Sequence, residues 1–155
     1  MIDKTRTSYT VMPITRSILA DLCQRIDQEL EKSNQDHSLA IYEIVSKKQH
    51  VQSHDSRSFL TYTLHDDLSS IFLRLQTPHR RITIKMSPSK DESYVAVEGS
   101  DPEWVRSTTQ RIGNIIDVHK SHIDKNQSFL PKLKSIVLRV CAGIMMWAML
   151  LRNAG

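Results

Sequence analysis

The sequence predicts an α+β fold, in which a small antiparallel sheet is covered on one face by two amphipathic helices and is followed by a C-terminal apolar helix. Three observations predict this class. Apolar residues recur at helical spacing over 14–32 and 101–125, polar and apolar residues alternate over 81–98, and the apolar run 135–151 carries a single charge. With 155 residues, the chain is long enough for one domain with its own core.

The composition is that of a globular protein with a mild basic bias. Hydrophobic residues make up 39% and charged residues 25% of the chain, which excludes wholesale disorder and low complexity. The formal net charge of +4 favours anionic surfaces, but it is smaller than a nucleic-acid-binding signature. The two cysteines, Cys23 and Cys141, indicate neither a disulfide framework nor a cysteine-based zinc site. Residues 1–13 lack a signal-peptide core, so we expect a cytosolic start.

The first helix is predicted over 14–32. Its apolar residues recur at spacings of three and four, and charged residues fill the positions between them. Pro13 suits the start of this helix, because the missing N–H of proline is not needed in the first turn. The apolar stripe must cover an apolar surface, and it consists of Ile14, Ile18, Leu19, Leu22, Ile26 and Leu30.

The pattern between 39 and 75 is less regular. β-Branched and aromatic residues predict a strand over 39–45. The polar stretch 47–58 is typical of a solvated strand end and loop, and a short strand is expected over 59–64. A short helix is then expected behind two aspartates, which suit a helix N-terminus, on the spacing of Leu68, Ile71, Phe72 and Leu75.

The clearest strand pattern lies further along the chain. Apolar and polar residues alternate over 81–87 and again over 93–98, and a turn-like polar segment separates the two runs. This arrangement predicts an antiparallel hairpin. One face of the hairpin should carry Ile82, Ile84, Met86, Val95 and Val97.

A second long helix is predicted over 101–125. Gly99 ends the preceding strand, and Ser100 and Glu103 have the spacing of a capping box. Trp104 opens the apolar stripe of this helix, so we expect it to anchor the core.

The run 135–151 is apolar on every side, with Arg139 as its only charged residue. Such a segment requires complete burial or lipid. We therefore expect a folded domain over 1–128, and a linker with a transmembrane helix over 129–155. Flanking positive charges predict that the domain stays on the cytoplasmic side. The expected membrane anchor consists of Ile136, Val137, Leu138, Val140, Ile144, Met145, Met146, Trp147, Met149, Leu150 and Leu151.

No motif fixes a reaction. HExxH, P-loop and GxGxxG patterns do not occur, so we expect no catalytic residue, no cofactor and no metal, although an enzyme of unrecognised type stays open. Ser53, His54 and Asp55 are the residue types of a hydrolytic triad, but a triad is assembled from separated segments, so we expect a polar loop. His50 and His54 would lie too far apart along a strand to share one ion.

The expected function is a non-catalytic interaction module, tethered to a membrane, that contacts membrane lipid and an unknown protein partner. Arg80, Arg81 and Lys85 cluster on the first hairpin strand and its approach, where they could contact an anionic partner. One alternative is a soluble homo-oligomer assembled through the apolar helix. Another is nucleic-acid binding, which is less favoured because Tyr94 is the one aromatic candidate on the predicted exposed faces.

Overall fold

The structure is a computed structural model that describes residues 1–33, 37–64, 66–89 and 92–122. The chain divides into two compact units, Met1–His119 and Lys120–Gly155, and the fold described below is that of the first unit. The predicted linker and membrane anchor over 129–155 lie outside the described residues.

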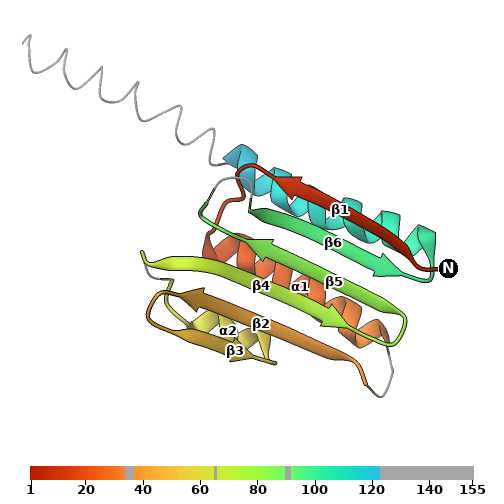
Figure 1. The fold of residues 1–155 in the computed structure, drawn as a ribbon, viewed down its shortest axis with the longest axis horizontal. Coiled ribbons are helices and arrows are strands. Elements are labelled where there is room, and N and C mark those ends of the chain that lie inside the picture. The colour runs from red at the N-terminus through yellow and green to blue at the C-terminus, as the bar shows by residue number, and fades with distance from the viewer. Residues whose placement is uncertain (34–36, 65, 90–91, 123–155) are drawn as a thin grey trace, which may run out of the picture. The chain divides into compact units, whose positions relative to one another are not determined.

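The first unit is an α+β domain built on a six-stranded antiparallel sheet, which confirms the predicted class (Figure 1). The strand order across the sheet is β1-β6-β5-β4-β2-β3. The strands are β1 (Asp3–Tyr9), β2 (Leu39–Ser46), β3 (His50–Ser53), β4 (Leu68–Gln76), β5 (Arg80–Met86) and β6 (Ser93–Gly99). The helices are α1 (Arg16–Ser33), α2 (Ser56–Thr61) and a third helix over 102–122.

One face of the sheet carries the core, and we call it the inner face. Successive side chains of a strand point to opposite faces, and here one of the two alternating sets is buried and almost entirely apolar. Burying apolar surface contributes about 25 cal/mol per Å², so this alternation fixes which face turns inward. The inner-face residues on the four central strands are Ala40, Tyr42, Ile44, Ile71, Leu73, Leu75, Ile82, Ile84, Met86, Val95 and Val97.

Helix α1 and the third helix both contribute buried side chains to this core. The buried residues of α1 follow helical spacing, and Figure 1 shows α1 behind the sheet. The third helix approaches β1, since Thr5 Oγ1 lies 2.7 Å from Thr109 Oγ1. Gly99 allows this helix to begin close to the sheet, because a Cβ at that position would lie 3.0 Å from the Trp104 ring.

Three of the predicted elements are confirmed. The helix over 14–32 is α1, the strand over 39–45 is β2, and the hairpin of 81–87 with 93–98 is the antiparallel pair β5–β6. The predicted second long helix is present over 102–122, but Asp101 caps it in place of Ser100. The Asp101 Oδ1 atom accepts hydrogen bonds from the backbone N–H groups of Glu103 and Trp104.

Two predictions between 56 and 76 are wrong. The expected helix behind the two aspartates is strand β4, because Ile71, Leu73 and Leu75 alternate into the core while Phe72 faces away. The expected strand over 59–64 overlaps helix α2, which Asp55 caps and Phe59 anchors. The stretch 47–58, expected as a solvated strand end and loop, contains the separate strand β3. Strand β1 was not predicted, because its sequence is mostly polar.

A buried carboxylate joins the two long helices. Glu29 is 3% exposed, its Oε2 accepts a 2.9 Å hydrogen bond from Trp104 Nε1, and it forms ion pairs with Arg25 and Lys32. Burial alone would raise the pKa of Glu29, but the hydrogen bond from Trp104 and the positive charges of Arg25 and Lys32 hold this pKa below its ordinary value of 4.5.

We predict that Glu29→Gln lowers the free energy of unfolding at pH 7 by about 1.5–3 kcal/mol, the usual contribution of a hydrogen bond to a charged group. Because the pKa is lower in the folded chain than in the unfolded chain, this stabilisation is complete above pH 4.5 and is lost as pH falls below it. Urea unfolding at neutral and acidic pH measures both effects. The gap between wild type and variant should narrow in acid, whereas a constant gap would contradict the linkage. Glu31→Gln, an exposed change on the same helix, is the control.

Candidate functional site

The face of the sheet opposite the core carries polar and aromatic side chains in cross-strand rows. We call it the outer face, and its rows follow from the strand register. One row contains Ser8, Tyr94, Lys85, Phe72 and Glu43. The next contains Arg6, Ala96, Thr83, Arg74 and Ile41, and the third contains Lys4, Glu98, Arg81 and Gln76.

Positive charge predominates in these three rows. They hold five cationic side chains and two carboxylates, Glu43 and Glu98, for a formal net charge of +3. The two carboxylates lie on different strands, where Glu43 pairs with Arg74 Nη1 at 3.0 Å and Glu98 pairs with Lys4 Nζ at 2.7 Å. These pairs fix the direction of two cationic side chains without cancelling the excess of positive charge.

Two aromatic rings lie among these cations. Tyr94 on β6 and Phe72 on β4 flank Lys85 in the same row, so their backbones are about 10 Å apart across two strand spacings. The guanidinium of Arg6 lies over the Tyr94 ring at 4.1 Å, and that of Arg74 lies over the Phe72 ring at 4.5 Å. Both distances are within the range of cation–π attraction, so each ring holds a cation in place.

The structure divides the predicted anionic-partner cluster between the two sides of the sheet. Arg81 and Lys85 share the outer face, four residues apart on β5. Arg80 is an odd number of residues from Arg81 and Lys85 along β5, so its side chain leaves the strand on the opposite side. Its guanidinium lies over the Trp104 ring at 4.8 Å. Arg80 therefore contacts the third helix, and it also lines the same pocket as Arg81.

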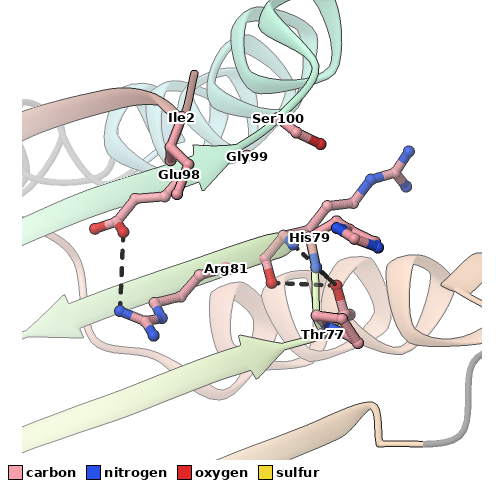
Figure 2. A pocket seen from close by; sticks show the side chains of 9 residues that line it. Ile2, Thr77, His79, Arg81, Glu98, Gly99 and Ser100 are labelled. Atoms are coloured by element: carbon pink, nitrogen blue, oxygen red, sulfur yellow. Dashed lines mark hydrogen bonds and ion pairs between the residues drawn. The ribbon is translucent and has the colours of Figure 1, made fainter.

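A pocket of about 260 Å³ lies at one end of the outer face. Figure 2 shows Thr77 and His79, on the turn between β4 and β5, across from Gly99 and Ser100, with Arg81 beside Glu98. Arg81 Nη1 lies 3.8 Å from Glu98 Oε2, so this ion pair belongs both to the pocket wall and to the third row of the outer face. The pocket is therefore continuous with the cationic surface.

A serine, a histidine and an aspartate also meet between α1 and the third helix. His119 Nε2 lies 2.7 Å from Asp21 Oδ2, and its Nδ1 lies 3.5 Å from Ser17 Oγ. The serine hydroxyl is closer to Thr15 Oγ1, at 3.0 Å, and neither pocket described for this unit is lined by the three residues. The geometry supports a contact between helices, since nucleophilic catalysis requires a close serine–histidine bond and a substrate cleft.

Other reactive side chains are engaged in structural contacts. Burial raises the pKa of the Cys23 thiol to about 12, and the charge of Asp27 adds to this effect, so the thiolate is scarce at neutral pH. His50 Nε2 pairs with Glu43 Oε1 at 2.5 Å, and His54 Nδ1 lies 2.9 Å from the Ala40 carbonyl oxygen. Within the described ranges, no group of three residues could hold a metal ion.

The predicted membrane anchor lies outside the described residues. Among the helices that the structure describes, none combines the length and hydropathy needed to cross a bilayer. Comparison with family models, curated proteins and solved structures found no match to this chain.

The residues of the outer face that sequence reasoning missed include Arg6, Phe72 and Arg74. Arg6 lies on a strand that was not predicted, and the other two lie on β4, where a helix was expected. The alternation of Ile71, Leu73 and Leu75 with polar or outward residues was the available signal. This alternation is hard to see in the sequence, because Phe72, one of the outward-facing residues of β4, is also apolar.

We predict that Leu73→Ala and Phe72→Ala differ sharply in cost, although the two residues are adjacent. Leu73 is fully buried, so its truncation should lower the free energy of unfolding by about 2–5 kcal/mol. Phe72 makes cross-strand contacts on the outer face, and its truncation should cost about 1 kcal/mol or less. Chemical denaturation measures both variants. Equal losses would show that Phe72 is a core residue and would remove it from the candidate site.

Proposed function

We propose that this chain is a non-catalytic interaction module whose outer sheet face binds an anionic partner, and whose C-terminal apolar run holds it at the cytoplasmic side of a membrane. The observation that carries the binding proposal is the set of five cations on one face of the sheet, three of which lie beside two aromatic rings. In this proposal the two long helices cover the inner face, which leaves the outer face available.

The charge and geometry of the outer face support binding in preference to catalysis. Arg6 and Arg74 are held by aromatic rings, so their side chains give up less freedom when they contact an anion. Arg74 is also fixed by Glu43, and its side chain is 39% exposed. Pre-organised, exposed guanidinium groups favour recognition of phosphate or carboxylate groups.

The tether proposal is supported by the sequence of the run 135–151. At about 1.5 Å per residue it is somewhat shorter than a hydrocarbon core of about 30 Å. Arg139 near one end can reach back to the interface through its long side chain, and local thinning of the bilayer absorbs the remaining shortfall.

We predict that the full chain sediments with membranes after a high-salt wash, because hydrophobic insertion does not depend on ionic strength. Truncation after Ser128 should move the protein to the supernatant. A full chain that stays in the supernatant, and loses self-association on the same truncation, would contradict the tether and identify a soluble oligomer. Cell fractionation followed by size-exclusion chromatography separates these results.

The binding proposal predicts that Arg6→Gln with Arg74→Gln lowers the salt concentration needed to elute the full chain from a sulfated polysaccharide column. A variant with fewer cations facing the polyanion releases fewer counterions on binding, so its affinity depends less steeply on salt. Lys48→Gln with Arg57→Gln removes the same charge from exposed positions off the outer face and serves as the control. Equal elution of the two double variants would show that net charge, rather than the outer face, governs retention.

A further inference from the structure

We propose that the anionic partner of the outer face is single-stranded nucleic acid, with bases stacked at Tyr94 and Phe72 and with backbone phosphates held by Arg6, Arg74 and Lys85. This inference rests on the proposed binding function and names the class of partner. It starts from the two rings, which a purely ionic surface would not need.

The register places the two rings where successive bases can reach them. Tyr94 and Phe72 occupy central strands of the sheet, separated by Lys85. In the neighbouring row, Ala96 lies next to Tyr94 on β6, and Thr83 lies next to Lys85 on β5. These two side chains are short, so the sheet surface beside the rings has room for a planar group. A planar base needs such room if it is to lie against an aromatic side chain on a strand surface.

The cations are placed to hold the backbone of the same strand. Arg6 and Arg74 lie over the two rings, and a guanidinium in this position presents a second planar surface together with N–H groups at its edge. A base can stack on the ring or on the guanidinium, and the N–H groups can donate to a phosphate. Lys85 lies between the two stacking positions, with its Nζ 6.0 Å from the Phe72 ring centre and 3.8 Å from the exposed carboxylate of Glu92, a contact that a phosphate would replace.

This arrangement favours single strands over two other anionic partners. A lipid headgroup supplies phosphate but no planar ring to stack on Tyr94 or Phe72. A duplex keeps its bases stacked inside, so it offers phosphates alone to a surface of this kind. Stacking is tolerant of sequence, so we expect a weak dependence of affinity on base identity.

The test measures fluorescence anisotropy of a labelled oligouridylate about 10 nucleotides long, within the site sizes of known single-strand binders, titrated with the full chain in neutral detergent. Tyr94→Ala and Phe72→Ala should each raise the Kd about 5- to 100-fold, the range expected when one base can no longer stack. Tyr94→Phe keeps the ring and should preserve the Kd. Tyr62→Ala removes an exposed tyrosine outside the sheet and should also leave it unchanged.

Two further arms identify the partner. A duplex of matched length should bind more weakly than the single strand. Wild type and Arg6→Gln with Arg74→Gln are also compared, in the same neutral detergent, for retention on beads that carry immobilised phosphatidylserine or phosphatidylcholine, because the apolar run would take both proteins into vesicles. Single-strand affinity that the two alanine variants do not change would overturn the stacking proposal. Arginine-dependent retention on phosphatidylserine beads without oligonucleotide binding would overturn the inference but leave the proposed anionic-partner function standing. If Arg6→Gln with Arg74→Gln changes the binding of neither the oligonucleotide nor phosphatidylserine, both the single-strand inference and the proposed anionic-partner function fail.

Discussion

Burial of one set of alternating strand side chains is the constraint on which the domain depends. Four inward residues of the hairpin are almost completely buried, and their burial fixes the face that carries the core. They are Ile82, Ile84, Val95 and Val97. Because side chains alternate along a strand, the same constraint sends Lys85 and Tyr94 to the opposite face. A slip of one residue would exchange the two sets, so the stability of the core also enforces the arrangement of the candidate site.

A polar link complements this apolar packing at the edge of the core. Glu29 on α1 accepts a hydrogen bond from Trp104, and the Trp104 ring carries the guanidinium of Arg80. The link therefore runs from one helix through the other to strand β5. Arg80 and Arg81 are adjacent in the sequence, but neighbouring side chains of a strand point to opposite faces. Arg80 therefore takes part in this structural link, whereas Arg81 lies on the outer face.

The sequence predicted the type and position of an element where its apolar residues follow a single periodicity. It failed where they fit both helical spacing and strand alternation. The hairpin and α1 follow a single periodicity, so their positions were predicted closely. In β4 the apolar residues satisfy helical spacing as well as strand alternation, because Phe72 on the outer face is also apolar. Of the candidate site, only Arg81, Lys85 and Tyr94 could be predicted. Their neighbours depend on pairing between strands that are distant in sequence.

The two proposed properties of this chain compete for the same charges. The cytoplasmic surface of a membrane is itself anionic, and it attracts basic side chains by about 1 kcal/mol each near the surface. A tethered domain with a net charge of +3 on one face would therefore meet lipid phosphate before any other polyanion. Charge alone cannot discriminate between these partners, whereas aromatic rings can, because stacking requires a planar ligand. Tyr94 and Phe72 are thus the residues that would let a single strand displace a headgroup from the outer face.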